Sequence, residues 1–442
     1  MGRGLLTSMI VLLAFVSDGQ KDITSMFPLK WKVKIGVTTY RTNMAFHEGH
    51  IYIGSNGEDR NTKLDKLDGV YKIDAKTGEI MHQFQSLLIG DNDVNGVVIG
   101  NGRIYFGGDD RHFYCYDLKT KNEVWKRRVG FDVESCPVLA DMNGDQKLDV
   151  IFNAEESGVT VLDGISGELI WFNDTIINHS GNMTPAVFDL NGDGTPDVVT
   201  AGRGEPNSSA VAAWKMAHYG DYHFALDGKT GEIMWVQESG AGIHASPCIR
   251  LQDGKITIAG LDAYGELTYM DHKGNQIFGA EYGYDSYSSP ILSKNDRMIV
   301  GVRNKISVTG IAPEYIYTNE EEGYTYISQD GPYEAIEMGG TLSATPVVAD
   351  ILGNGKLQII VADESGTLII TDEDCKVTEG FKIPTGAEAS CFIQDIDGDG
   401  QLELLVADLN GYLYCYDTKS SGEVFWESYR GNKLNTGVAE LD

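Results

Sequence analysis

Short apolar segments alternate with polar turns along this 442-residue chain, and one succession of the two recurs. In each copy a strand-like run ends in Asp, a polar turn follows, and a second run often closes on an aromatic residue. The copies lie near the aspartates Asp74, Asp117, Asp163, Asp227, Asp271, Asp372 and Asp417. Alternation of apolar and polar residues is typical of half-buried β-strands, and the turn residues mark hairpins. The chain is therefore predicted to consist of short strands joined by tight turns.

A second hairpin precedes these copies, as in residues 136–154 and 184–202. Each unit thus reads as four short strands, called A, B, C and D from the ring axis outward. Four strands in about 45–60 residues are typical of a propeller blade. We predict an all-β chain, a single β-propeller of eight four-stranded blades within residues 28–442. The blades are expected to begin near residues 43, 95, 134, 183, 244, 287, 342 and 388.

Three segments depart from the regular repeat. Residues 311–340 fit the pattern poorly, so we expect an insertion in the sixth blade. Trp31 stands where a D strand would precede the first blade, and we expect this segment to close the ring against the last blade. The tail, residues 429–442, is expected to wrap that closure.

The phrase Asp-x-x-Thr-Gly-Glu-x-x-Trp, seen at residues 227–235, resembles the repeat of the PQQ-like, or quinoprotein-dehydrogenase-like, β-propellers. The resemblance extends over nearly all of the chain after its N-terminus. In that family the Trp side chains dock between neighbouring blades. The matching residues here are Trp125, Trp171, Trp235 and Trp426. The resemblance implies the fold, but fold alone does not fix activity.

Three predicted A–B turns carry oxygen-bearing residues at alternate positions. The first loop offers Asp141, Asn143, Asp145, Lys147 and Asp149. The second loop offers Asp189, Asn191, Asp193, Thr195 and Asp197. The third loop offers Asp395, Asp397, Asp399, Gln401 and Glu403. Calcium prefers six to eight oxygen ligands, which alternate residues of a tight turn aim inward. We therefore predict about three calcium sites.

In each loop, positions 1, 3, 5 and 9 would supply side chains and position 7 its carbonyl oxygen. The loops resemble those of FG-GAP or integrin-type propellers, which bind calcium in the same hairpin. Good hairpin turns also favour Asp and Gly, which is the plainer interpretation of the same residues. A fourth loop, residues 350–358, has no acidic residue at positions 3 and 9. We predict no calcium there, and a structural role for the other three sites.

The net charge and the N-terminal segment limit the partners and the cellular location expected for this protein. A net charge of −30 argues against nucleic acid as a partner, because phosphate binding needs clustered Lys and Arg. Residues 1–20 contain Arg3 and a short apolar run, which predicts a signal peptide. No later stretch predicts a transmembrane helix. The expected location is secreted, periplasmic or at the cell surface, and the expected state is a monomer.

If the A–B and C–D turns share one face, the D–A and B–C loops share the other, which surrounds the channel mouth. We expect a ligand on this mouth face, because its loops are rich in acids and histidines. The candidate residues are Asp91, Asp93, Asp110, His112, Asp132, Glu134, His179, Arg203, His218, Asp221, His223 and His244. The same loops offer Glu155 and Glu156. Such residues suit a polar ligand, either a glycan or a protein.

Several functions remain open at this point. The first is a noncatalytic binding or scaffold module. The second is a calcium-dependent polysaccharide lyase or hydrolase, because some rhamnogalacturonan lyases are eight-bladed propellers with similar loops. The third is a quinoprotein dehydrogenase, which uses adjacent cysteines beside its cofactor. The six cysteines of this chain include no adjacent pair, so PQQ is not expected. A bacterial outer-membrane assembly factor shares the repeat but normally lacks calcium loops.

Overall fold

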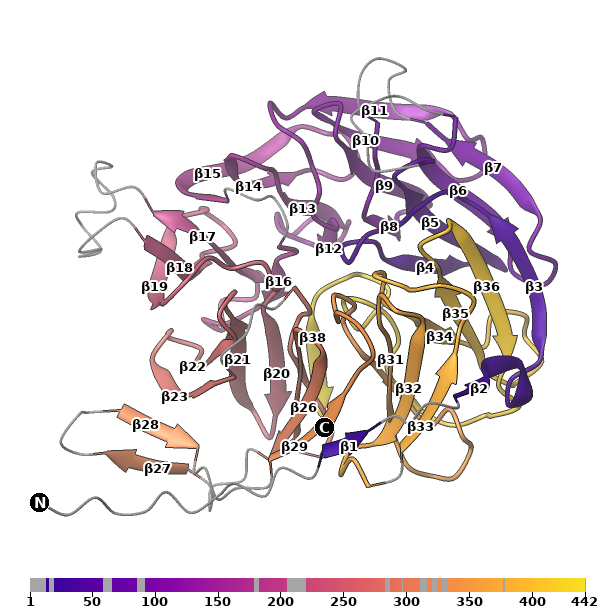
Figure 1. The fold of residues 1–442 in the computed structure, drawn as a ribbon. Helices are drawn as coiled ribbons and strands as arrows, with labels where there is room; N and C mark the ends of the chain where they lie inside the picture. Colours follow the sequence, from indigo (N-terminus) through magenta and orange to yellow (C-terminus); the bar gives the residue numbers. More distant parts are fainter. Residues whose placement is uncertain are drawn as a thin grey trace, which may run out of the picture.

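The structure is a computed structural model. It describes residues 13–15, 20–58, 66–85, 92–178, 183–204, 220–282, 287–295, 297–310, 316–319, 324–327, 333–376 and 378–441. Apart from one 3-10 turn, η1 (Ile23–Ser25), the regular elements of these residues are β-strands. The strands form eight blades around a central axis (Figure 1). The predicted all-β, eight-bladed propeller is confirmed.

The first four blades follow one another along the chain. Blade one contains β4 (Met44–His47), β5 (His50–Ser55), β6 (Gly69–Asp74) and β7 (Ile80–Phe84). Blade two contains β8 (Val97–Gly100), β9 (Arg103–Gly108), β10 (His112–Asp117) and β11 (Glu123–Arg128). Blade three contains β12 (Val138–Ala140), β13 (Asp149–Asn153), β14 (Ser157–Leu162) and β15 (Leu169–Asn178). Blade four contains β16 (Ala186–Phe188), β17 (Asp197–Gly204), β18 (Gly220–Leu226) and β19 (Ile233–Ser239).

The other four blades complete the ring. Blade five contains β20 (Cys248–Gln252), β21 (Lys255–Leu261), β22 (Glu266–Asp271) and β23 (Gln276–Glu281). Blade six contains β24 (Ile291–Leu292), β25 (Arg297–Val302), β26 (Lys305–Gly310) and β29 (Tyr333–Glu337). Blade seven contains β30 (Val347–Ala349), β31 (Gln358–Ala362), β32 (Thr367–Asp372) and β33 (Thr378–Lys382). Blade eight contains β34 (Phe392–Gln394), β35 (Glu403–Ala407), β36 (Tyr412–Asp417) and β3 (Leu29–Lys34).

The irregular sixth repeat corresponds to an extra hairpin. β27 (Ile316–Asn319) and β28 (Tyr324–Ile327) stand between the third and fourth strands of blade six, and β28 pairs with β23 of blade five. Two short N-terminal strands add to other blades. β1 (Leu13–Phe15) pairs with β29, and β2 (Lys21–Asp22) pairs with β33. Of the predicted signal peptide, residues 1–12 and 16–19 lie outside the described residues. In the described part of the chain, the structure contains no helix long and apolar enough to cross a membrane.

Ring closure joins the two ends of the chain. β3, near the N-terminus, pairs antiparallel with β36, so it supplies the outermost strand of blade eight (Figure 1). The nonlocal pairing removes one seam at which the ring could open. A closed ring leaves only short strand edges exposed, which protects an all-β chain from edge-to-edge association.

Tryptophans of four D strands contact the next blade of the ring. The indole of Trp171 donates to the Gly228 carbonyl oxygen at 2.7 Å and covers Gly231, whose φ is 72°. Trp125 and Trp235 make the equivalent contacts with the next C–D turns. In blade eight this residue is Trp31, not Trp426 as the repeat predicted, because the N-terminus supplies the D strand there.

Trp426 belongs instead to a C-terminal tail that lines the axis of the ring. β37 (Val424–Trp426) pairs with β30, and β38 (Val438–Leu441) runs parallel to β20. Between them, Arg430 donates to the Pro247 carbonyl oxygen at 2.7 Å, and Asn435 donates to that of Pro137 at 2.9 Å. The inner edge of each innermost strand carries backbone N–H and C=O groups that no other strand of the blade pairs. The tail supplies hydrogen-bond partners for groups on these edges. It therefore fills the channel and does not wrap the outside of the closure.

Candidate metal loops and ligand face

The three acidic A–B loops share one backbone arrangement. The position-1 carboxylate of Asp189 accepts from the backbone N–H groups of Gly192 at 2.8 Å and Gly194 at 2.9 Å. Asp141 and Asp395 make the same two bonds within their own loops. These bonds wind the backbone of each loop around its position-1 carboxylate. The first loop lacks the second glycine, and there Gln146 takes up a left-handed conformation with φ of 64°.

Position 9 is the buried anchor of each loop. Asp149, Asp197 and Glu403 are all 0% exposed. Asp197 accepts from Leu190 N at 3.0 Å and from Gly228 N at 2.9 Å, so it ties the A–B loop to the C–D turn of the same blade. This contact places both kinds of turn on one face, called the turn face. Burial raises the pKa of Asp149 and of Asp197 to about 6. A cation beside them would stabilise the charged form.

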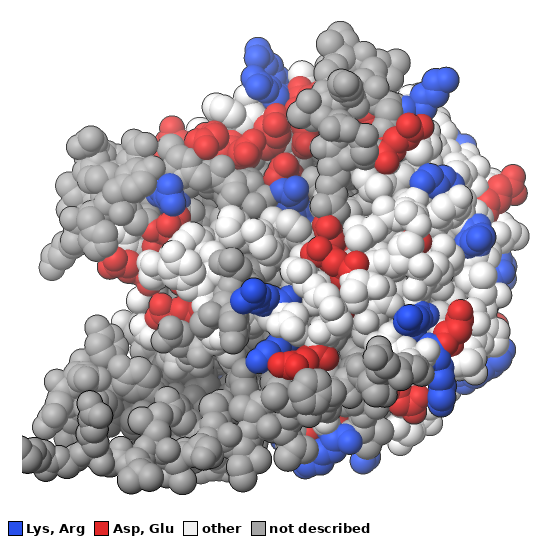
Figure 2. All heavy atoms as spheres, in the orientation of Figure 1, with Lys and Arg blue, Asp and Glu red and all other residues white. Residues whose placement is uncertain are grey.

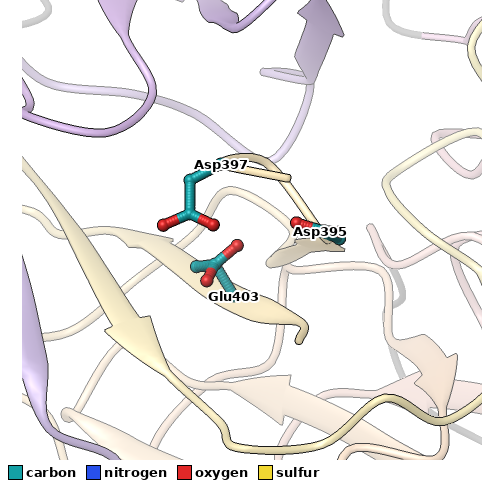
Figure 3. Close-up of side chains that lie close together, drawn as sticks. All are labelled: Asp395, Asp397 and Glu403. Carbon is teal, nitrogen blue, oxygen red and sulfur yellow. The ribbon is translucent and has the colours of Figure 1, made fainter. Parts of the chain in front are cut away.

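In the third loop, three carboxylates converge. One oxygen from each of Asp395, Asp397 and Glu403 lies within 4.8 Å of the others. Figure 3 shows Asp397 and Glu403 facing each other across the turn, with Asp395 beside them. Hard oxygen donors at this spacing fit calcium. The first two loops have Asn at position 3, Asn143 and Asn191, and therefore carry one acidic group fewer there.

Lys30 of β3 also reaches the third loop. Its Nζ lies 2.6 Å from Asp397 Oδ2 and 2.9 Å from Glu403 Oε1. Burial alone would lower the pKa of Lys30, but the two hydrogen bonds outweigh burial and raise it. The hydrogen bond from Lys30 lowers the pKa of Asp397. The corresponding contact in the second loop is more exposed, because Lys229 meets Asp193 at 2.8 Å with half of its side chain in solvent.

The fourth loop forms a similar turn, but a side-chain amide at position 9 occupies its interior. Asp350 accepts from Asn354 N and Gly355 N, at positions 5 and 6, whereas position 1 of the other loops accepts from positions 4 and 6. At position 9, Gln358 donates from Nε2 to Asn354 Oδ1 at 3.1 Å and to the Lys356 carbonyl oxygen at 2.5 Å. These two acceptors stand at positions 5 and 7, which would be calcium ligands in the other loops. The chain's own N–H groups therefore satisfy them.

The D–A and B–C loops lie on the opposite face, called the mouth face. Asp91, His179 and His218 lie outside the described residues. Asp132 and Arg111 are 3.7 Å apart, Arg203 and Asp221 are 3.3 Å apart, and Glu134 pairs with Arg41. The structure thus arranges several predicted ligand residues as ion pairs, two of them between neighbouring loops and one, Arg203–Asp221, between the paired strands β17 and β18.

Three other candidates of this face are drawn inward. Asp93 is buried. Asp110 accepts from the Tyr114 hydroxyl at 2.5 Å and from the backbone N–H of His112 at 3.1 Å, so it shapes its own turn. His223 lies inside the molecule at 0% exposure, beside Gly260 of blade five, and burial lowers its pKa to about 4. The prediction from strand order put His223 in a loop, whereas it belongs to β18.

At the mouth, the predicted residue His244 lies beside tyrosines that the sequence did not single out. The Tyr287 ring lies 5.2 Å from that of Tyr40 and 5.0 Å from that of His244, centroid to centroid. These rings come from three different D–A loops, so they bridge blades above the filled channel. Tyr287 is 38% exposed, and Tyr264 in the B–C loop of blade five is 66% exposed. Aromatics in loops carry no periodic signal, which explains why sequence reasoning missed them.

Acidic groups lie on the same face. Figure 2 shows Asp and Glu side chains gathered over blades two and three, with Lys and Arg dispersed around them. Glu155 in the B–C loop of blade three donates its backbone N–H to the Asp132 carbonyl oxygen at 2.8 Å. Burial, followed by the charge of Asp132, raises the pKa of Glu155. A carboxyl whose pKa is raised by burial and by a neighbouring carboxylate is a candidate for acid–base chemistry.

Comparison with known families agrees with this geometry. Residues 141–200, which contain the first and second loops, match the model of the FG-GAP-like repeat. Residues 358–438 match the model of the lambda-carrageenase β-propeller domain. This chain is a β-propeller with an FG-GAP-like repeat. Comparison with curated protein sequences gives no match.

Solved structures share the fold of the whole propeller. BamB from Moraxella catarrhalis is 15% identical over 88% of this chain and 99% of its own, with a TM-score of 0.56. The quinohemoprotein alcohol dehydrogenase from Comamonas testosteroni is 13% identical over 92% of this chain and 79% of its own, with a TM-score of 0.59. A europium-containing methanol dehydrogenase is 11% identical over 96% and 91%, with a TM-score of 0.58. Identities this low establish the fold alone.

Proposed function

We propose that this propeller is an exported, noncatalytic binding module that holds a glycan on its mouth face and is stabilised by calcium on its turn face. The observation that carries the proposal is the exposure of aromatic rings at the mouth. Three of them, Phe131, Tyr264 and Tyr287, are 43%, 66% and 38% exposed in loops of that face. Large aromatic side chains left in solvent commonly mark binding surfaces.

The remaining features of the face favour a sugar polymer over other ligands. Aromatic rings offer flat apolar surfaces to the C–H faces of sugars, and the neighbouring ion pairs offer hydrogen-bond donors and acceptors to hydroxyl groups. The match of residues 358–438 to a carrageenase propeller domain supports a polysaccharide ligand. The acidic residues over blades two and three, with a net charge of −30, favour an uncharged polymer over a polyanion.

Calcium fits the first and second loops. Each offers carboxylates at positions 1, 5 and 9, an amide at position 3 and a carbonyl at position 7 around a glycine-containing turn. Position 9 links the loop to the neighbouring C–D turn, so a bound cation would rigidify the whole outer end of the blade. This role is structural, because the turn face lies on the far side of the ring from the proposed glycan site.

The glycan proposal is tested by binding of the full chain to a panel of uncharged polysaccharides in calcium. Tyr264→Ala and Tyr287→Ala are expected to weaken binding about fivefold or more, since a buried aromatic contact is worth about 1–3 kcal/mol. Phe172→Ala is the matched control, because Phe172 is 45% exposed on the outer strand of blade three. Failure of a folded chain to bind any polymer would point to a protein ligand.

The alternative function, a catalytic one on the same ligand, rests on Glu155. Its raised pKa and its position beside Asp132 suit the general acid of a hydrolase, and polysaccharide cleavage is the corresponding activity. The assay is the release of reducing ends or unsaturated products from any polymer that binds. If cleavage occurs, Glu155→Gln is expected to abolish it while binding persists. Absence of product from a bound polymer supports the noncatalytic module.

A further inference from the structure

The third loop differs from the first two because a distant lysine enters its ligand set. Lys30 donates at 2.6 Å to Asp397 and at 2.9 Å to Glu403, which are positions 3 and 9 of the loop. The side chains of Lys30, Asp397 and Glu403 are 20%, 15% and 0% exposed, so the contact is largely shielded from water. Screening by solvent is weak for such a cluster.

The first two loops have no equivalent contact among the described residues. Position 3 is Asn143 or Asn191, and its amide points toward the C–D turn aspartate of the same blade, at 3.4 Å from Asp163 or 3.3 Å from Asp227. Lys229 touches only position 5 of the second loop and is half exposed. It can therefore swing into solvent without disturbing the buried anchor at position 9.

We propose that Lys30 competes with calcium at the third loop: its ammonium binds Asp397 and Glu403 when the cation is absent, and calcium displaces it. The inference rests on the calcium sites of the proposed function. Calcium binds carboxylate oxygens at about 2.3–2.6 Å. It would share Asp397 Oδ2 and Glu403 Oε1 with an ammonium a few ångströms away, and two cations so close repel each other strongly in a shielded site.

The location of Lys30 gives this competition a structural consequence. Lys30 lies on β3, which closes the ring by pairing with β36. In the calcium-free protein, the ammonium contact fastens this N-terminal strand to the A–B loop of its blade. With calcium bound, the loop becomes rigid, but the side-chain contact between loop and strand is released. The third site therefore fills at higher calcium than the first two, and its filling is coupled to the packing of the closing strand.

Calorimetric titration of calcium into the full chain tests the proposal. Lys30→Met keeps the apolar stem and removes the charge. It is expected to tighten the weakest site about tenfold, the equivalent of one partly shielded ion pair, and to leave two sites unchanged. Lys32→Met is the matched control on the same strand, where the lysine lies over the Tyr412 ring. Adding Asp397→Asn to Lys30→Met should abolish the gain and so locate it.

Chemical labelling of lysines supplies a readout that does not depend on affinity. Lys30 should be protected from acetylation in chelator and become reactive in calcium, whereas Lys32 should react in both. Two strong sites with no change on Lys30→Met, or calcium that further protects Lys30, would overturn the competition while leaving the first two loops intact. A wild-type chain that takes up no calcium would instead refute the calcium sites of the proposed function.

Discussion

Substitution of Gly231 by Ala tests how blades are locked together. Gly231 has φ of 72°, and a Cβ atom there would stand 2.7 Å from Cε3 of Trp171. The left-handed backbone alone costs a non-glycine residue about 1–2 kcal/mol. The clash forces the indole or the turn to move, and overpacking of this kind costs about 1–3 kcal/mol more. The total destabilisation expected for Gly231→Ala is about 2–5 kcal/mol.

Comparison with Gly254→Ala separates the cost of the Trp171 contact from the cost of the left-handed backbone. Gly254 has the same φ of 72°, but nothing lies within 4 Å of the position that a Cβ atom would take, so only the backbone cost applies. Urea unfolding of both variants, followed by tryptophan fluorescence and circular dichroism, measures the difference. Gly231→Ala should unfold with at least about 1 kcal/mol less stability than Gly254→Ala. Equal losses would refute the idea that Trp171 locks blade three to blade four.

Three further predictions concern the tail and the loops. Asn435→Ala removes hydrogen bonds to Val97 O, Pro137 O and Asn43 from a residue with φ of 60°, and should cost about 2–4 kcal/mol in urea unfolding. Burial raises the pKa of Glu427 to about 7, so its contribution to stability is fully present below its ordinary value of 4.5 and is lost as pH rises through 7. Glu427→Gln should therefore gain about 2 kcal/mol over the wild type between pH 5 and pH 8, and parallel stability profiles would contradict this assignment. Asp189→Ala should remove one calcium from the binding stoichiometry and, at calcium a hundredfold above the dissociation constant, about 2.7 kcal/mol of the stability gained from calcium. Asn354→Ala in the fourth loop should change neither the stoichiometry nor the stability gained from calcium.

Local sequence was sufficient to predict the repeated parts of this protein. In the C–D turns of blades one to four, the Asp accepts hydrogen bonds from the residues two and three positions ahead, as Asp227 does from Lys229 and Thr230, so the turn is encoded within four residues. The A–B loops are equally local, because Asp189 at position 1 holds its own backbone. The D-strand tryptophans repeat at a fixed distance from these turns, which revealed Trp125, Trp171 and Trp235 as blade contacts.

The sequence misled where the partner of a residue lies far along the chain. Trp426 follows the last C–D phrase nine residues after Asp417, close to the eight-residue spacing of the other tryptophans, yet the outer strand of blade eight comes from the N-terminus and carries Trp31. The repeat could not reveal that Trp426 enters the channel, because the tail has no counterpart in the other blades. His223 was assigned to a loop because the strand β18 begins earlier than its blade's spacing indicated.

By itself, the sequence determined the all-β class and the shape of the A–B loops, because both depend on contacts within one hairpin. It also determined the number of blades, because each blade is one copy of the repeat. Only the tertiary structure decided which lysine side chains contact those loops. Lys30 is 367 residues from Asp397 in sequence, and ring closure alone brings them together. The rings of Tyr40, His244 and Tyr287 likewise meet only because D–A loops from different blades converge around the axis.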